Sequence, residues 1–356
     1  MPPPPRLPLG CRLTQEHDGE CPLKALSLLA AGDARITEVN KPTHLEGELL
    51  LKVEMVGLCG SDLNSFRGRN PLISYPRVLG HEIAATVLKG DSATPAGTRV
   101  TVSPYTSCGR CSSCRRGREN ACQDNRTFGV QRDGAITERI VVPASKVFPS
   151  TLPLKQLCLV EPLTVGFHAC ARGRVTSQDC VAVFGCGGIG LGAISGAAFR
   201  GARTIAIDLD DAKLETARLA GATELIHSGR DDVSARLREI TGGSGPDVVI
   251  EAIGLPETFR MAVEEVAFTG RVVYIGYAKE PVAYETRLFV QKELDILGSR
   301  NAQPQDFLDV ITMLEAGTFP VEEAVTAVVS LDEAPSILSR WSENPAAYTK
   351  IMIQLG

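Results

Sequence analysis

Two kinds of hydrophobic pattern divide the chain. From Leu23 to about Pro149, short apolar runs alternate with polar positions and are broken by glycine and proline, as in ELLLKVEMVGLCG (48–60) and RVLGHEIAATVLKG (77–90). Alternation with a period of two is typical of strands that bury one face. This part of the sequence therefore predicts a β-rich domain.

From about Gly173 the pattern changes to apolar strands that alternate with helical segments. Six runs have the length and composition of buried strands: CVAVFG, TIAID, ELIHS, DVVIEAIG, GRVVYIGY and LDILGS. Between them lie segments with helical spacing of apolar residues, such as AKLETARLAGA and DDVSARLREITG. This alternation predicts a doubly wound parallel sheet with helices on both faces, so the chain as a whole belongs to the α/β class.

The last part of the chain returns to the first pattern. Residues 303–356 hold one helical segment, QDFLDVITMLEAG, and two strand-like runs, VTAVVS and KIMIQL. We assign the helix to the boundary and the strands to the first domain. The predicted domains are therefore 23–172, completed by 317–356, and 173–316. The proline-rich residues 1–22 are predicted to be a flexible extension.

Composition narrows the class of protein. A length of 356 residues suits two domains of about 150 residues each. The formal charge is −5, and no run approaches the roughly 18 apolar residues of a membrane span. The isolated basic cluster RRGR at 115–118 indicates a solvated turn, so we expect neither a nucleic-acid nor a membrane partner.

The start of the sequence bears on the redox state of the cysteines. The opening MPPPPRLPLGCRL lacks the continuous apolar core of a secretion signal. We therefore expect a cytoplasmic protein whose 11 cysteines are mostly reduced thiols.

Four of these cysteines lie close together. The segment CGRCSSCRRGRENAC contains Cys108, Cys111, Cys114 and Cys122. In a reducing compartment such spacing indicates a metal site. Four thiolates at about 2.3 Å complete the tetrahedral shell of Zn²⁺ and leave no position for a substrate, so the predicted site is a structural zinc. A redox-active thiol cluster is the alternative.

A glycine-rich turn marks a second site. The segment VAVFGCGGIG places a G-x-G-x-x-G sequence directly after an apolar strand and at the opening of a helix. In this context the glycines allow a tight turn and close approach of a pyrophosphate to the helix N-terminus. A glycine turn without a ligand is the alternative. The predicted cofactor-binding residues of this turn are Gly185, Gly187, Gly188, Ile189 and Gly190.

The next strand supplies a residue that selects the cofactor. The run TIAID ends at Asp208, where a carboxylate can accept hydrogen bonds from the adenosine ribose hydroxyls and repel a 2′-phosphate. This favours NAD over NADP. Lys213, in the following helical segment, can reach the same ribose or remain a solvated surface lysine.

Further metal-ligand residue types lie in three segments. Cys59 lies in GLCGSD, His81 and Glu82 lie in VLGHEIAA, and Glu161 opens EPLTVGFHA. A lone buried cysteine or histidine is usually a core residue. Taken with the cysteine loop and the glycine-rich turn, however, these segments resemble the zinc-dependent medium-chain dehydrogenases in order and spacing. The resemblance is greatest to the branch of polyol, aldonate and threonine dehydrogenases.

The resemblance implies a GroES-like β domain that holds a catalytic zinc beside a Rossmann domain that holds the nicotinamide. Cys59 and His81 match zinc ligands of the family. Glu82 and Glu161 match two glutamates of the polyol branch, and either can bind zinc while the other holds water. The resemblance also implies two zinc ions per chain and a homodimer or homotetramer.

The proton path departs from the pattern of the family. Ser61 matches the hydroxyl of the family's proton relay, but the histidine that follows in many relatives is replaced by Asn64, which cannot titrate. We therefore favour Glu161, acting through a water molecule, as the base.

Three further polar residues, Arg300, His168 and Asp62, also have predicted roles. Arg300 in LGSRNA aligns with an arginine that reaches substrate hydroxyls in the sorbitol branch, and a surface ion pair is the alternative. His168 is interpreted as a helix-packing residue and Asp62 as a structural hydrogen-bonding residue. The cysteines expected to be reduced and buried are Cys158, Cys170, Cys180 and Cys186.

These features together predict an NAD- and zinc-dependent dehydrogenase that acts on a secondary hydroxyl of a sugar alcohol or sugar acid. Threonine- or butanediol-type alcohols are the alternative substrates. A zinc- and nucleotide-binding protein without turnover is the alternative from another functional class.

Overall fold

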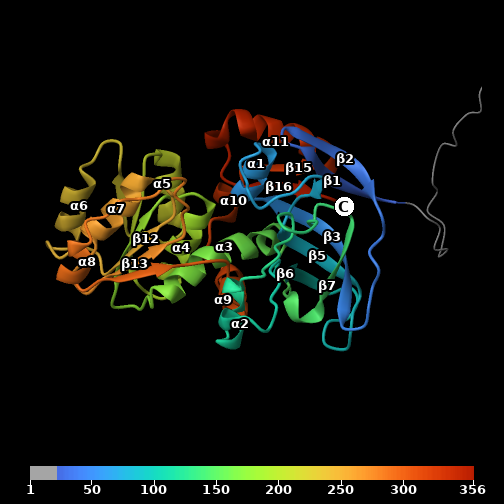
Figure 1. Cartoon of the computed structure of the whole chain (residues 1–356), viewed down its shortest axis with the longest axis horizontal. Coiled ribbons are helices and arrows are strands. Elements are labelled where there is room, and N and C mark those ends of the chain that lie inside the picture. Colours follow the sequence, from blue (N-terminus) through green and yellow to red (C-terminus); the bar gives the residue numbers. More distant parts are fainter. Residues whose placement is uncertain (1–21) are drawn as a thin grey trace, which may run out of the picture.

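A computed structural model describes residues 22–356 and places two sheet-containing parts on either side of a central helix, α3 (Leu154–Arg172) (Figure 1). The prediction for residues 1–22 concerns positions outside this range, apart from Pro22. The predicted domain boundaries are not settled by the element positions and stay predictions.

The first part is built mainly from antiparallel strands. Its larger sheet has the order β15-β16-β3-β5-β6-β8, with β7 paired to β3, and a smaller sheet has the order β2-β1-β4. Every second residue of β3 from Leu49 to Met55 is buried, which explains the alternation in the sequence. The strands are β1 (Leu23–Ala30), β2 (Asp33–Val39), β3 (Glu48–Leu58), β4 (Arg77–Val78), β5 (Glu82–Lys89), β6 (Arg99–Val102), β7 (Arg139–Pro143), β8 (Val147–Pro149), β15 (Ala327–Ser330) and β16 (Ile351–Gln354).

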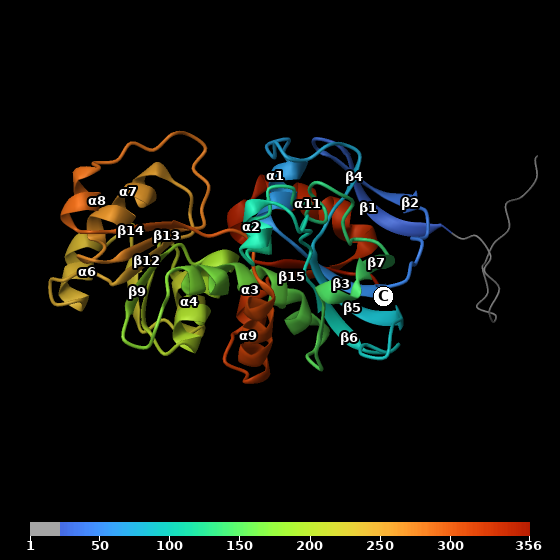
Figure 2. The ribbon, with the colours of Figure 1, turned by 60° about the horizontal axis from the view of Figure 1, so that its bottom comes forward.

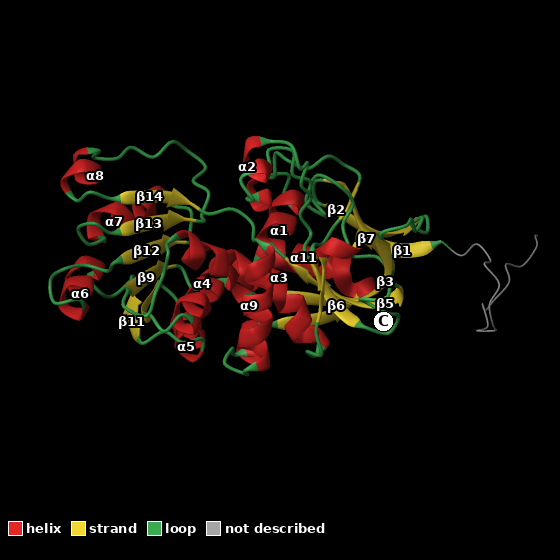
Figure 3. Cartoon of the chain, turned by 90° about the horizontal axis from the view of Figure 1, so that it is seen from below, coloured by secondary structure: helices red, strands yellow, loops and turns green. Residues whose placement is uncertain are grey.

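The second part is a parallel sheet with the order β11-β10-β9-β12-β13-β14. The chain runs outward from β9 in one direction and then resumes at β12 on the other side, so a topological switch point lies between these strands. Figure 3 shows helices on both sides of the sheet. The strands are β9 (Cys180–Phe184), β10 (Arg203–Asp208), β11 (Glu224–His227), β12 (Val248–Glu251), β13 (Arg271–Tyr274) and β14 (Asp295–Gly298). The helices are α4 (Gly188–Phe199), α5 (Asp211–Leu219), α6 (Val233–Ile240), α7 (Pro256–Glu265) and α8 (Arg287–Gln291).

Both faces of the parallel sheet are buried. On β9, Val181 and Val183 belong to a core that also contains residues of α3 and α4, whereas Ala182 and Phe184 belong to a separate core with residues of α6 and α7. Side chains of successive strand residues point to opposite faces, so both faces need apolar residues. This explains the continuous apolar runs in the sequence and confirms the predicted fold class.

Helix α3 joins the two parts because apolar residues lie on most of its sides and nearly every residue from Leu157 to Cys170 is buried. One hydrophobic core contains residues of α3 and α4 together with Met55, Ala84 and Phe148 from the first part. A helix that is apolar on all sides is stable only when it is buried on all sides. The remaining helices are α1 (Gly60–Phe66), α2 (Ser112–Arg115), α9 (Pro304–Glu315), α10 (Val321–Ala324) and α11 (Ala334–Glu343).

Helices α3 and α4 meet at positions without side chains. A Cβ atom on Gly166 of α3 would lie 2.1 Å from the backbone nitrogen of Ala193, and one on Gly192 of α4 would lie 2.7 Å from the carbonyl oxygen of Leu163. Neither distance is compatible with a real Cβ atom. The two backbones therefore approach as closely as glycine permits.

Candidate metal and cofactor sites

Sheet register brings together three residues of metal-ligand type. Cys59 directly follows β3 and is the N-cap of α1, while His81 directly precedes β5. Strands β3 and β5 are antiparallel neighbours, with Gly57 opposite Glu82. As a result, one potential ligand atom from each of Cys59, His81 and Glu82 lies within 4.8 Å of the others.

The surroundings of His81 are negatively charged. Its Nδ1 atom is buried and has no hydrogen-bond partner, and a carboxylate oxygen of Asp62 accepts a hydrogen bond of 2.9 Å from the backbone N–H of Cys59. Burial disfavours the charged imidazole, but the negative charges of Asp62, Cys59 and Glu161 outweigh burial and raise the pKa of His81 well above its ordinary value. An acidic buried cluster around an unpartnered imidazole nitrogen fits a divalent cation.

Glu82 has a cationic partner that the sequence did not reveal. Lys350 Nζ lies 2.6 and 2.7 Å from the two carboxylate oxygens of Glu82, and both side chains are buried. Lys350 immediately precedes β16, whose pairing with β3 also places its ammonium 3.3 Å from the carbonyl oxygen of Leu58. A Cβ atom on Gly188 would lie 4.0 Å from Lys350 Cε. Lys350 therefore lies between Glu82 and the glycine-rich turn.

Glu161 approaches the cluster from α3 and is held by a tyrosine. The hydroxyl of Tyr105 donates a hydrogen bond to Glu161 Oε1, and both side chains are buried. Burial raises the pKa of Glu161, since the charged form is disfavoured away from water, while the positive charge of His81 acts in the opposite direction. Glu161 is not part of the group within 4.8 Å that contains Cys59, His81 and Glu82. Tyr105 could not be identified from the sequence, because it does not belong to a recognisable motif.

The proposed relay residues lie on α1. Ser61 is half-buried, and its hydroxyl oxygen is inaccessible to solvent and has no hydrogen-bond partner. Asn64, which lies one turn later, is exposed. These positions leave the role of Ser61 as a prediction.

The four-cysteine loop has the dimensions of a tetrahedral metal site. One sulfur atom from each of Cys108, Cys111, Cys114 and Cys122 lies within 4.8 Å of the others, and Cys111 Sγ lies 3.4 Å from Cys114 Sγ and 3.9 Å from Cys122 Sγ. Ligands at about 2.3 Å from a tetrahedral zinc are about 3.8 Å apart, whereas a disulfide would bring two sulfurs to about 2.0 Å.

Hydrogen bonds in the loop favour thiolates. The backbone N–H groups of Cys108 and Cys111 donate to the sulfurs of Cys122 and Cys108 at 3.3 and 3.4 Å. The side chain of Ser113 lowers the pKa of Cys111 to about 5 through a hydrogen bond, whereas burial raises the pKa of Cys114 to about 12. One thiolate therefore forms readily, and further thiolates need a cation to compensate their charge.

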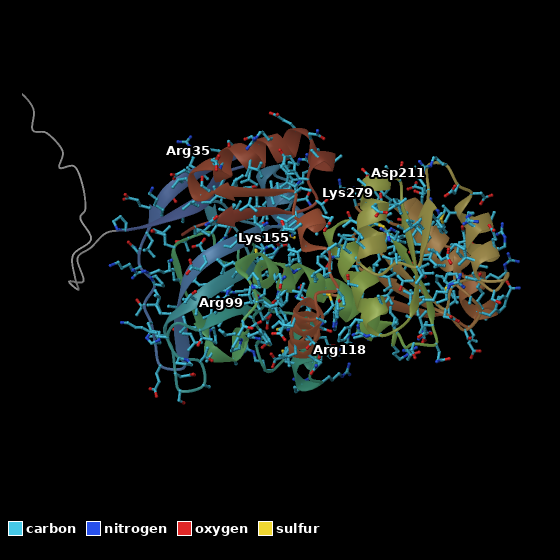
Figure 4. All side chains as sticks on the ribbon, turned by 180° about the vertical axis from the view of Figure 1, so that it is seen from behind. Arg35, Arg99, Arg118, Lys155, Asp211 and Lys279 are labelled. Carbon is cyan, nitrogen blue, oxygen red and sulfur yellow. The ribbon has the colours of Figure 1, made fainter. Side chains whose placement is uncertain are left out.

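The cysteine loop lies beside the central helices. Figure 2 shows α2, which belongs to this loop, above α3 and α9, and Figure 4 labels Arg118 of the same loop on the side where α9 lies. Hydrogen bonds from Asn120 to α3 and to the segment after β14 agree with this placement.

The glycine-rich turn has the predicted position between β9 and α4. Gly185 adopts a positive φ of 96°, and a Cβ atom on Gly190 would lie 1.7 Å from the carbonyl oxygen of Gly185, so glycine is required at both positions. Gly187 is the N-cap of α4, and Gly188 and Ile189 are its first residues. Gly187 and Gly188 thus leave the backbone at the N-terminus of α4 without side chains, as close approach of a pyrophosphate requires.

Asp208 lies at the end of β10 and contacts the same turn. Its Oδ2 accepts a hydrogen bond of 2.7 Å from the backbone N–H of Cys186, and its Oδ1 accepts one of 2.8 Å from Leu209. A carboxylate can accept further hydrogen bonds, so a ribose contact remains open to it. Lys213 is half-buried in the first turn of α5, where its backbone N–H is capped by Asp210.

Arg300 and His168 are linked through Asn120. Arg300 follows β14 and its side chain is exposed, while its carbonyl oxygen accepts a hydrogen bond of 2.8 Å from the Asn120 amide. His168 is not only a packing residue, because its two ring nitrogens lie 2.9 Å from Asn120 Nδ2 and from Asp306 Oδ2. No sequence motif indicates this network, because its members lie far apart along the chain.

The remaining predicted thiols differ in burial. Cys158, Cys170 and Cys186 are buried and free, but Cys180 is only half-buried, so its predicted burial was wrong. Cys180 is the first residue of β9, where the strand has not yet entered the core. Of the helices in residues 22–356, none combines the length and apolar character that a membrane crossing requires.

Comparison with known proteins places these sites in a family. Residues 45–153 match the alcohol dehydrogenase GroES-like domain, and residues 188–316 match the zinc-binding dehydrogenase domain. An uncharacterised zinc-type alcohol dehydrogenase-like protein of Haemophilus influenzae is 35% identical, covering 92% of this chain and 98% of the relative. The L-galactonate-5-dehydrogenase of Escherichia coli is 33% identical over 80% and 85% of the two chains. The sorbitol dehydrogenase of Bacillus subtilis is 31% identical over 93% and 97%.

Solved structures agree with this placement. An Escherichia coli alcohol dehydrogenase in complex with NADH is 29% identical, covers 94% of this chain and 99% of its own, and superposes with a TM-score of 0.85. A zinc-binding dehydrogenase of Sinorhizobium meliloti bound to NADP is 30% identical over 94% and 100% of the two chains, with a TM-score of 0.86. The glycine-rich turn and the two cysteine-containing clusters thus occur in a chain that belongs to the zinc-binding alcohol dehydrogenases of the medium-chain superfamily.

Proposed function

We propose that this dehydrogenase uses NAD to oxidise, reversibly, a secondary hydroxyl of a sugar alcohol or sugar acid. The observation that carries the proposal is that two buried carboxylates surround His81: Glu82 groups with Cys59 and His81 within 4.8 Å, and the charge of Glu161 helps to raise the pKa of His81. The L-galactonate and sorbitol dehydrogenases among the relatives act on substrates of this class, as their names state.

Zinc fits the residues of both clusters. In the active site, Cys59 and His81 would hold the ion together with Glu82 or Glu161, and the four-cysteine loop would hold a second, structural ion. When bound in the active site, zinc supplies Lewis-acid polarisation of the substrate hydroxyl.

A residue of this chain can accept the proton that the substrate hydroxyl loses. A bound nicotinamide would supply a hydride acceptor, so the proton of the substrate hydroxyl would have to leave separately. Glu161 is the favoured acceptor, since burial raises the pKa of Glu161 and thereby makes its carboxylate a stronger base. Tyr105 fixes the orientation of this carboxylate through its hydrogen bond. Asn64 cannot take part because an amide does not titrate.

Specificity rests on two further residues. The exposed guanidinium of Arg300 can form paired hydrogen bonds with vicinal hydroxyls or with a carboxylate. Asp208, which contacts the glycine-rich turn, favours NAD by repelling the 2′-phosphate of NADP. We further expect a homodimer or homotetramer, and the free thiols among residues 22–356 fit a reducing, cytoplasmic environment.

Turnover by the purified protein tests the proposed reaction. The zinc-loaded protein should form NADH with at least one sugar alcohol or sugar acid in a panel that varies chain length and stereochemistry. A higher kcat/KM for threonine or butanediol would assign a different substrate class. If no member of the panel yields NADH, a binding protein without turnover is the correct assignment.

The cofactor preference is tested with Asp208→Ala. Loss of the ribose contacts should weaken NAD, and loss of the negative charge should help NADP, so the ratio of kcat/KM for NADP over NAD should rise roughly tenfold or more. Asp211→Ala is the matched control, since it removes the same charge from an exposed residue that pairs with Arg230. An unchanged ratio in Asp208→Ala would show that Asp208 does not contact the ribose.

The proton path is tested with Glu161→Gln and Asn64→His. Removal of the proposed base should lower kcat by roughly 10² or more, whereas a histidine at position 64 should change kcat little. Zinc content must be measured beside the rates, because Glu161→Gln can also fail by losing metal. Near-normal turnover in a zinc-replete Glu161→Gln variant, or a large gain in Asn64→His, would contradict the assignment.

The structural zinc is tested with Cys111→Ser. Loss of one thiolate should reduce the metal content from about two to about one zinc per chain and lower the melting temperature, since the two sites share no ligand. Cys180→Ser is the control, because this free thiol lies at the start of β9, outside the cysteine loop. Retention of both ions by Cys111→Ser would exclude the cysteine loop as a metal site.

A further inference from the structure

A buried asparagine connects the cysteine loop to the segment after β14. Asn120 lies in the short 3-10 helix Glu119–Ala121, between Cys114 and Cys122, and is 3% exposed. The side-chain amide of Asn120 donates a hydrogen bond of 2.8 Å to the backbone carbonyl oxygen of Arg300, and the backbone carbonyl oxygen of Asn120 accepts one of 2.9 Å from the side-chain amide of Asn301. These two reciprocal bonds, here called the asparagine clasp, hold the peptide that carries Arg300.

The orientation of the Asn120 amide is fixed by its partners. One amide proton is directed to the Arg300 carbonyl oxygen, which can only accept, and the other is directed to His168 Nε2 at 2.9 Å. His168 Nε2 is therefore the acceptor, and its Nδ1–H donates to Asp306 Oδ2 at 2.9 Å. An amide turned by 180° would place Oδ1 against the Arg300 carbonyl. The present orientation is favoured although it leaves Oδ1 of Asn120 buried without a partner.

Asp306 extends the network to α9. The same carboxylate oxygen that accepts from His168 also accepts a hydrogen bond of 2.7 Å from the backbone N–H of Gln303, the N-cap of α9. Asp306 and His168 are 4% and 3% exposed. The segment between β14 and α9 is thus held at its far end by α9 and in its middle by the clasp.

The clasped peptide has a backbone conformation that needs support. Asn301 has a φ of 53°, in the left-handed region that residues other than glycine rarely adopt. Asparagine tolerates this region better than most residues, and its side chain is used to reach Asn120. Beside this fixed backbone, the Arg300 side chain is exposed. The clasp therefore fixes the backbone from which the exposed Arg300 side chain extends.

We infer that Asn120 is a positioning residue for substrate binding, which acts by holding the backbone of Arg300 so that its guanidinium faces the substrate hydroxyls or carboxylate. The inference rests on the proposed function, in which Arg300 contacts the substrate. It also gives the cysteine loop a role in specificity, because the loop carries Asn120 between two of its cysteines.

A double-mutant cycle in the zinc-loaded protein tests this inference. Asn120→Ser should raise the KM for the best substrate of the panel roughly tenfold, the effect of losing about one hydrogen bond to a charged group, while kcat, the KM for NAD and the zinc content stay near their wild-type values. Arg300→Ala should raise the same KM at least as much. In the Arg300→Ala background, Asn120→Ser should add less than about twofold, because the group that Asn120 positions is already absent.

Two further variants separate positioning from general stability. Asn301→Gly keeps the positive φ accessible and removes one bond of the clasp, so it should raise the substrate KM in the same direction as Asn120→Ser. Asn125→Ser is the matched control, since Asn125 lies just after the cysteine loop and its amide bonds Thr127 instead of the 300–301 peptide. This control should leave the substrate KM unchanged.

The outcomes distinguish failure of the inference from failure of the proposed function. An unchanged substrate KM in Asn120→Ser, or the same increase with and without Arg300, would overturn the positioning role. If the protein turns over no substrate, the proposed function fails. The rate of backbone amide hydrogen exchange in residues 299–303 then tests whether the asparagine clasp holds this segment. Faster exchange in Asn120→Ser, and not in Asn125→Ser, supports the clasp, whereas equal exchange in both overturns it.

Discussion

The position of the cluster of Cys59, His81, Glu82 and Glu161 relative to the glycine-rich turn depends on the close contact between α3 and α4. Because Gly166 and Gly192 offer no side chains, the backbones of the two helices touch. Helix α3 carries Glu161, and α4 begins at the glycine-rich turn, so this contact sets the distance between the Glu161 carboxylate and that turn. A methyl group at Gly166 would lie 2.1 Å from the backbone nitrogen of Ala193, so an alanine there would push the two helices apart and change this distance.

Charge balance imposes a second constraint on the same region. Cys59, Asp62, Glu82 and Glu161 can all become negative there, whereas the buried groups that can carry a positive charge beside them are Lys350, which pairs with Glu82, and His81. Burial of several like charges is costly unless opposite charges accompany them. A divalent ion bound by Cys59 and His81 would offset the remaining negative charge. Loss of that ion would therefore be expected to destabilise the fold around these residues.

Features that depend on residues within one short segment could be predicted from the sequence. Contacts between residues far apart in the chain could not. The cysteine loop, the glycine-rich turn and the β-α alternation each depend on residues a few positions apart, where periodicity and chain stiffness act directly. Lys350 lies 268 positions from Glu82, and Asn120 lies 180 positions from the carbonyl of Arg300. A lysine before a strand and an asparagine in a loop have no local signature. Only strand pairing and helix packing give these residues their partners.

The pairing of β16 with β3 has a consequence for synthesis of the chain. Lys350 contacts the carbonyl of Leu58 across 292 positions, and the whole parallel sheet lies between them in sequence. At ordinary translation rates of about 5–20 residues per second, the ribosome needs about 15 to 60 s to make the intervening chain. During that time β3 lacks one of its partner strands, β16, and Glu82 lacks the ammonium group of Lys350. The edge of β3 that pairs with β16 therefore stays unpaired, and can pair with other chains, until the later part of the protein has been made.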